Sequence, residues 1–236
     1  MLIAWQLAGW LGLVDVTFSS SPIRIVKALV TIFRTGEIYP ALGATGLELF
    51  LGLLVTFVAG IPAGLLIGRV GWLYDMTEPI INILYSVPFV LFLPIIIFWF
   101  GIDDASRVLV IIWSAILPLI INVTAGVRAL DHDYQRVAAV YCAPRIKFFS
   151  AVALPATLPY ILAGVRQALG RALVGAIVAE FFMSSQGLGY FVQQQTSGLN
   201  MDSAMAGIVL LAVAALLLNG GVRALERRFT HWAGAQ

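Results

Sequence analysis

The chain has 236 residues, of which 61% are hydrophobic and only 11% are charged, and its formal net charge is +2. A soluble domain normally carries about 25% charged residues, so this composition excludes an ordinary soluble protein, and the small net charge gives no indication of nucleic-acid binding. At about 20 residues per membrane span, the length accommodates roughly five or six spans. The only cysteine, Cys142, excludes an intramolecular disulfide.

Apolar segments long enough to cross a hydrocarbon core of about 30 Å recur along the chain. A shorter apolar segment, Leu2–Val14, precedes them and either needs a thinned bilayer or belongs to a longer native N-terminus; it lacks the basic start and cleavage site of a signal peptide. Polar and apolar residues alternate only weakly, which argues against strands, and an exposed sheet edge is not stable in lipid. The expectation is an all-α polytopic membrane protein whose five full spans are Gly43–Ile67, Ile80–Phe100, Val108–Gly126, Thr157–Met183 and Ser203–Val222.

The segment 15–42 is predicted to be an amphipathic connector. Ser19–Ser21 followed by Pro22 is a good helix start, and basic residues then alternate with apolar ones at helical spacing, as in a helix that lies in a membrane interface. Trp72–Ile83 has a similar pattern.

Basic residues predict the orientation of the spans in the membrane. The four on one side are Arg24, Lys27, Arg34 and Arg107. The eight on the other side predict a cytoplasmic location for both termini, including the tail 223–236, and for the insert between the third and fourth full spans; they are Arg69, Arg128, Arg136, Arg145, Lys147, Arg223, Arg227 and Arg228.

Prolines interrupt two of the spans, Pro88 and Pro94 in one and Pro118 in the next. Membrane helices tolerate proline where neighbouring helices or water satisfy the freed backbone groups. The prolines therefore indicate either kinks for packing or a distorted wall beside a transport path.

The insert at residues 128–156 is too polar to span a bilayer and too short to be a domain. Asp131 or Asp133 can cap a helix that runs to about Cys142, Pro144 ends it, and a second short helix follows. The insert is either an amphipathic loop on the bilayer or a docking helix for a soluble subunit. The docking interpretation is supported by the small side chains of Ala138, Ala139 and Ala143, which would allow a partner protein to approach the helix closely.

The helix after the insert carries a small residue at every fourth position, a pattern typical of close helix–helix contact; the four are Gly164, Ala168, Ala172 and Ala176. Ionisable residues in membrane spans are functional candidates. The candidate pathway residues are accordingly Arg166, Arg171 and Glu180, with Glu180 also compatible with an outer interface, and Glu48 is expected to be interfacial at the start of its span.

Ser184–Asp202 contains no basic residue, as expected of an outer loop. Gly187-Leu188-Gly189 predicts a turn, followed by a short half-buried helix that contains Gln193, Gln194 and Gln195. The segment is either a polar loop or part of an outer gate that receives a delivery protein.

Several motifs are absent from the sequence. Neither Lys27 nor Lys147 lies in a phosphate-binding G-x-x-x-x-G-K-[ST] motif, no G-x-S-x-G occurs, and His132 and His231 fall in cytoplasmic segments, so no metal site and no catalytic residue is predicted. An ion-coupled secondary carrier is the alternative, but it would need intramembrane carboxylates and usually internal repeats, and Glu180 stands nearly alone. Energy from another subunit is therefore favoured.

The run Arg136–Pro155, together with ILAGVRQALGRALVGAIVAEFF and GLGYF, resembles the permease subunits of bacterial ATP-binding-cassette (ABC) importers, closest to the nitrate/sulfonate/taurine branch. The resemblance covers nearly the whole chain. Arg136 stands where that family's docking loop usually has glutamate and Cys142 where it has glycine, so docking here implies a reversed partner charge. The docking residues implied by the resemblance are Arg136, Val137, Ala138, Ala139, Cys142, Ala143, Pro144, Arg145, Leu154 and Pro155.

The resemblance implies a type I ABC importer permease fold, with five full transmembrane helices, a short first helix and a cytoplasmic coupling-helix loop in one domain over 1–236. It implies a bacterial inner-membrane location and an importer that moves a small anion such as a sulfonate or nitrate. It also implies the partners: an ATPase subunit that carries ATP and Mg²⁺, a second permease copy in a homodimer, an extracytoplasmic solute-binding protein and the lipid bilayer. No cofactor, enzymatic activity or nucleic-acid partner is expected for the chain itself.

Overall fold

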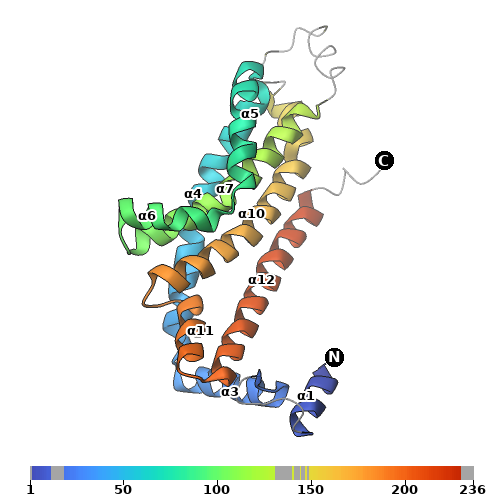
Figure 1. Ribbon diagram of the computed structural model, residues 1–236. Coiled ribbons are helices and arrows are strands. Elements are labelled where there is room, and N and C mark those ends of the chain that lie inside the picture. The colour runs from blue at the N-terminus through green and yellow to red at the C-terminus, as the bar shows by residue number, and fades with distance from the viewer. Residues whose placement is uncertain are drawn as a thin grey trace. The chain divides into compact units, whose positions relative to one another are not determined.

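The computed structural model describes residues 2–11, 19–130, 140, 144, 147 and 149–229, and every element in that part of the chain is a helix (Figure 1). The all-α expectation is thereby confirmed. In chain order the helices are α1 (Leu2–Trp10), α3 (Pro22–Thr35), α4 (Ile38–Arg69), α5 (Gly71–Ser86), η1 (Phe89–Phe92), α6 (Leu93–Phe100), α7 (Asp104–Arg128), η2 (Phe149–Ala153), α10 (Leu154–Met183), α11 (Leu188–Ser197) and α12 (Met201–Phe229).

Four helices of the described chain, α4, α7, α10 and α12, are long and apolar enough to cross a membrane. The bent pair formed by α5 and Phe89–Phe100 brings the number to up to five, which agrees with the predicted number of spans. The predicted span Ile80–Phe100 falls within this pair, which is bent by 93°: α5 ends at Ser86 and α6 begins only at Leu93. Pro88 lies in this break. It has no backbone N–H to donate, and its ring disfavours the helical conformation in the preceding residue, Val87.

Helix ends follow local sequence signals. The predicted start of α3 is confirmed, because Ser21 occupies the N-cap position and Pro22 the first turn. The helix ends at Gly36, whose φ of 78° is left-handed. At the start of α7, the backbone N–H and hydroxyl of Ser106 both donate to Asp103 Oδ1 at 3.1 Å, and these bonds lower the pKa of Asp103. The charged carboxylate thus caps the helix.

The chain divides into two compact units, and helices α4, α7, α10 and α12 continue from one into the other. The first unit consists of residues 1–51, 93–111 and 173–217, and the second consists of residues 52–92, 112–172 and 218–236.

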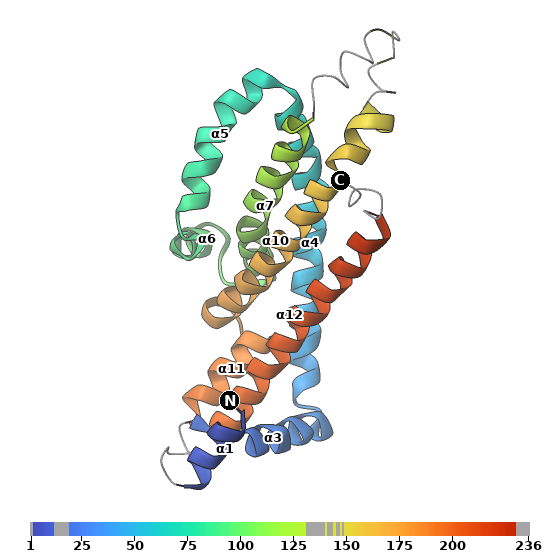
Figure 2. The same ribbon diagram turned by 90° about the vertical axis from the view of Figure 1, so that its right-hand side faces the viewer.

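The core of the first unit forms around the buried face of α3. Ile25 and Ile32 are seven residues apart and therefore lie on the same face of the helix. They pack with Leu188 and Phe191 of α11 and with Ala206 of α12. Figure 2 shows α3, α11 and the beginning of α12 gathered together. The helix α3 of the connector predicted for 15–42 therefore packs Ile25 and Ile32 against protein, whereas four other large apolar side chains of this helix stay exposed, namely Ile23, Val26, Val30 and Phe33. Helix α4 already begins at Ile38, inside the range assigned to the connector.

In the second unit, α4 and α7 approach closely through glycines. A Cβ atom at Gly64 would lie 2.7 Å from the Cβ of Val123, and the same is true at Gly68 against Val127. The Thr124 hydroxyl donates to the Gly64 carbonyl oxygen at 3.2 Å. This small-residue contact with an interhelical hydrogen bond is typical of helix packing in membranes.

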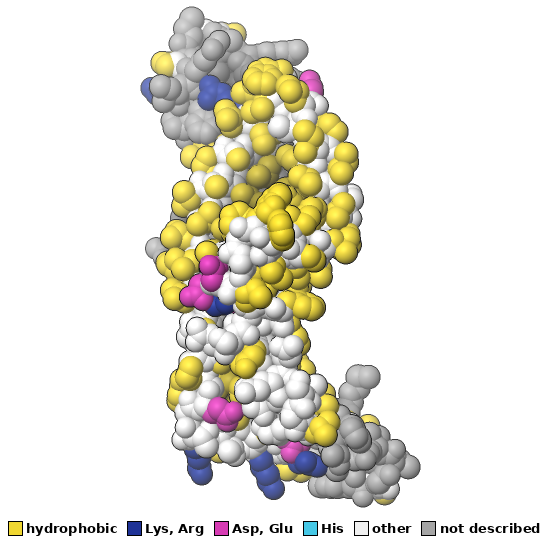
Figure 3. Space-filling model, turned by 60° about the vertical axis from the view of Figure 1, so that its left-hand side comes forward, with side chains coloured by type: hydrophobic (Ala, Val, Ile, Leu, Met, Phe, Trp, Pro, Cys, Tyr) yellow, Lys and Arg dark blue, Asp and Glu magenta, His cyan; other side chains and the backbone are white. Residues whose placement is uncertain are grey.

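Large hydrophobic side chains are exposed along the candidate spans. They include Val58 on α4, Phe98 and Trp99 on α6, and Leu216 and Leu217 on α12, all at least two-thirds exposed. Figure 3 shows hydrophobic side chains spread over the surface with few acidic or basic ones among them. Apolar exposure on this scale indicates contact with lipid or with another subunit.

Candidate functional site

A buried carboxylate organises the first unit. Glu180 on α10 is 0% exposed. The Thr45 hydroxyl on α4 donates to Glu180 Oε1 at 2.5 Å, and the backbone N–H of Gly189 donates to Oε2 at 2.5 Å. The backbone N–H of Leu188 in turn donates to the Thr45 hydroxyl oxygen at 2.8 Å. Glu180 and Thr45 together satisfy the first turn of α11, where free N–H groups and the helix dipole favour a negative charge.

Glycine is required at two positions near the start of α11, the N-cap position Gly187 and the second helical position Gly189. Gly187 has φ 112°, a conformation that side chains rarely adopt. A Cβ there would collide with the Glu180 carboxyl group, and a Cβ at Gly189 would lie 2.9 Å from Glu180 Oε2. Of the turn predicted at Gly187-Leu188-Gly189, only Gly187 precedes the helix, because α11 already begins at Leu188. The glycines are needed because the Glu180 carboxylate lies directly against this stretch of backbone.

A second buried polar cluster surrounds Arg107, which is 4% exposed. Its Nε donates to Glu48 Oε1 at 2.7 Å, its Nη1 donates to the Met183 carbonyl oxygen at 3.1 Å, and its Nη2 pairs with Asp104. The cluster joins α4, α7 and the end of α10. Glu48 is buried, and α4 begins upstream, at Ile38, which places Glu48 inside the helix. Its interfacial depth in the membrane stays a prediction.

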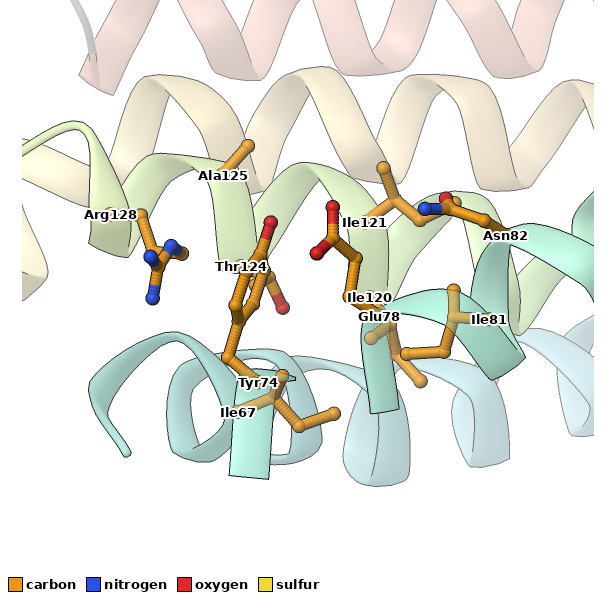
Figure 4. A pocket seen from close by; sticks show the side chains of 10 residues that line it. All are labelled: Ile67, Tyr74, Glu78, Ile81, Asn82, Ile120, Ile121, Thr124, Ala125 and Arg128. Carbon is orange, nitrogen blue, oxygen red and sulfur yellow. The ribbon is translucent and has the colours of Figure 1, made fainter. Parts of the chain in front are cut away.

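The second unit contains a cavity of about 210 Å³ between α5 and α7. Figure 4 shows its lining, which combines one carboxylate, one guanidinium, one phenol, one amide, one aliphatic hydroxyl and apolar side chains. The Arg128 guanidinium lies 3.7 Å from the centroid of the Tyr74 ring, and Glu78 is within hydrogen-bonding reach of the Tyr74 hydroxyl. The ten lining residues are Ile67, Tyr74, Glu78, Ile81, Asn82, Ile120, Ile121, Thr124, Ala125 and Arg128.

Further polar contacts in the second unit link α10 with α5 and α7. Arg171 Nη2 donates to the Tyr85 hydroxyl at 3.3 Å, and its guanidinium lies 5.3 Å from the centre of that ring. The Asn122 side-chain amide donates to Gln167 Oε1 at 2.8 Å. Helices α5, α7 and α10 thus carry polar contacts between residues that do not all line the cavity.

The structure separates the three pathway residues predicted from the sequence. Glu180 belongs to the first unit and is engaged in the cap of α11, whereas Arg166 and Arg171 belong to the second unit and are exposed. Sequence reasoning missed Thr45, Arg107 and Tyr74. The sequence shows Arg107 as a basic residue next to a strongly apolar span, but this pattern does not indicate which residues Arg107 contacts.

The stripe of small residues on α10 is buried at all four positions. A Cβ atom at Gly164 would lie 3.0 Å from the Cβ of Asn122 and 3.1 Å from a methyl carbon of Leu119. This close approach to α7 is what the predicted packing role requires.

The predicted docking segment lies largely outside the described residues. Pro144 is exposed, and Leu154 and Pro155 form the first turn of α10. The remaining seven predicted docking residues fall outside the described part of the chain: Arg136, Val137, Ala138, Ala139, Cys142, Ala143 and Arg145.

These features define a multi-span, all-helical membrane protein with polar groups inside the bundle and a basic insert between two spans. Residues 60–231 match the family described as binding-protein-dependent transport system inner membrane component. The chain belongs to this family: it is a permease subunit of the ABC importers, from the nitrate/sulfonate/taurine branch, and an inner-membrane protein.

Relatives cover nearly the whole chain. SsuC of Bacillus subtilis (strain 168), whose name assigns it to aliphatic sulfonates transport, is 34% identical over 98% of this chain and 84% of its own length. The taurine transport system permease protein TauC of Escherichia coli (strain K12) is 32% identical over 99% of this chain and 87% of its own. The nitrate import permease protein NrtB of Leptolyngbya laminosa is 35% identical over 75% of this chain and 63% of its own.

The fold is also that of a solved transporter. A chain of the MetNI methionine ABC transporter, in an inward-facing form, aligns with a TM-score of 0.65, 21% identity and coverage of 82% of this chain and 94% of that one. This similarity confirms the expected permease fold.

Proposed function

We propose that two copies of this chain, each acting as one permease domain over residues 1–236, form the path by which a small anion of the sulfonate or nitrate class enters the cell. The observation that carries this proposal is the 34% and 32% identity, over nearly the full chain, to relatives named for sulfonate and taurine transport. An extracytoplasmic binding protein delivers the solute.

The energy comes from a separate ATPase that holds ATP and Mg²⁺ and docks on the segment 128–156. The described ends of this segment support the assignment, because α7 ends at Arg128 and α10 begins at Leu154. Movement of the segment therefore acts directly on two helices of the bundle. ATP can drive the cycle only if the ATPase binds the two conformations of the permease with different affinity.

Charge introduced into the docking segment tests this assignment. Ala143→Asp places an unpaired carboxylate where close contact is expected, and we expect co-purification of the ATPase to fall by about thirtyfold, which is the effect of losing a contact worth about 2 kcal/mol at the centre of an interface. The measurement is the ratio of ATPase to permease after affinity purification of the complex.

Ser197→Asp is the matched control, since Ser197 is exposed at the end of α11 in the first unit and lies outside the segment. It should leave the ratio unchanged. Equal retention of the ATPase by Ala143→Asp and by the unmodified chain would refute docking through this segment.

A further inference from the structure

The cavity of the second unit is formed by one face of α5 and one face of α7, together with Ile67 of α4. On α5, Tyr74, Glu78 and Ile81 recur at intervals of four and three residues, and on α7, Thr124 and Arg128 are four residues apart. These spacings place each set on a single helical face. The volume of about 210 Å³ is below the 300–1,000 Å³ typical of sites for drug-sized ligands, so the cavity suits a smaller solute.

Two opposite charges line this cavity without pairing with each other. Among the described residues no ion pair joins Glu78 and Arg128. Arg128 stacks on the Tyr74 ring instead, and in Figure 4 that ring lies between the guanidinium and the Glu78 carboxylate. Glu78 lies within α5 and Arg128 is the last residue of α7, at the end of that helix predicted to face the cytoplasm. Both signs of charge are therefore present in one small site.

We propose that this cavity is a site for the transported solute and that it selects a small zwitterion, with an ammonium group toward Glu78 and an anionic group toward Arg128. An aminosulfonate has this chemistry. The inference rests on the proposed function and specifies the solute within the sulfonate class.

The arrangement disfavours ligands with a single charge. A simple anion at Arg128 would leave the Glu78 carboxylate without a counter-charge in the cavity and would be repelled by it, whereas a simple cation at Glu78 would meet Arg128. A zwitterion compensates both residues. Because Glu78 and Arg128 are exposed, each contact is weak, as release from a transport path requires.

Protection of an introduced cysteine tests the site in the assembled transporter in lipid nanodiscs. Asn82→Cys places a thiol in the cavity lining. We expect taurine to slow the modification of this thiol by methyl methanethiosulfonate. Ethanesulfonate lacks the ammonium group, so it should need about three to five times the concentration of taurine for equal protection, which is the effect of losing one exposed ion pair. Peptide mass spectrometry measures the modified fraction separately from Cys142.

Three variants serve as controls. Ile83→Cys lies next in sequence and is 65% exposed but does not line the cavity, so neither solute should protect it. Glu78→Gln should remove the advantage of taurine over ethanesulfonate, and Arg128→Gln should weaken protection by both.

The proposal is overturned if taurine fails to protect Asn82→Cys, if Ile83→Cys is protected equally, or if the two solutes are equivalent with Glu78 present. Should ATP-driven uptake of a sulfonate persist in any of these cases, the site assignment alone falls. Should no sulfonate be taken up with ATP, the proposed function falls as well.

Discussion

At the scale of single residues, the first unit depends on a few buried polar groups whose partners are distant in sequence. Thr45 and Glu180 are 135 positions apart, and Glu48 and Arg107 are 59 apart. Burying such groups is costly unless they are paired. Removing one member therefore leaves its partner without compensation, and this gives each pair a measurable signature.

Glu180→Ala should loosen α11. The substitution removes the acceptor of the Gly189 N–H and of the Thr45 hydroxyl, and leaving such buried donors unpaired costs about 1–3 kcal/mol each. We expect a lower midpoint of thermal unfolding in detergent and faster amide hydrogen exchange at the start of α11. Glu37→Ala is the control, because Glu37 makes an exposed contact with Gln195, and it should change neither. Unaltered exchange at Gly189 in Glu180→Ala would contradict the role assigned to the carboxylate.

Arg107→Leu should destabilise the protein by about 3–5 kcal/mol, because it leaves the Glu48 carboxylate buried without its counter-charge. The double variant Glu48→Met/Arg107→Leu should recover most of this loss, since an apolar pair of similar size needs no compensation. Chemical unfolding of the single and double variants measures the difference. A double variant that is less stable than Arg107→Leu would show that the pair is not the principal interaction of Arg107.

At the scale of helices, glycines decide how closely neighbours pack. Gly64→Ala should destabilise the second unit by about 1–3 kcal/mol, the usual cost of overpacking, because its Cβ would meet Val123 at 2.7 Å. Gly46→Ala in the same helix is the matched control, since a Cβ there meets nothing within 4 Å; it should be neutral or stabilising by up to about 1 kcal/mol. Thermal unfolding of both variants provides the comparison, and equal midpoints would refute the close contact of α4 with α7.

The sequence predicts helices better than it predicts their interruptions and their contacts. The start of α3 at Pro22 and the turn at Gly187 are determined by local backbone chemistry, so they could be predicted. The break after Ser86 could not be placed, because Pro88 and Pro94 both lie in the apolar stretch and only packing decides which one ends the helix. The same limit explains why Glu180 could be selected as a functional candidate while Thr45 could not: hydropathy identifies a charge in a span but carries no information on its distant partner.

At the scale of the whole molecule, composition alone indicated a polytopic α-helical membrane protein, and the residues around the insert resembled the importer permeases to which the chain belongs. Apolar side chains remain exposed on α4, α6 and α12, as they must on a protein that meets lipid and other subunits. The sequence could not show which residues line the pathway. Arg171 and Glu180 lie on the same helix but belong to different units, and this division cannot be read from the sequence.

The source of energy is tested most directly by uptake into proteoliposomes that contain this chain, its ATPase and its binding protein. With labelled taurine as the probe, uptake should require ATP on the ATPase side, stop with a non-hydrolysable analogue and be unaffected when proton and sodium gradients are collapsed. Uptake that continues without ATP and follows an ion gradient would contradict the assignment of this chain as the membrane half of an ATP-driven importer.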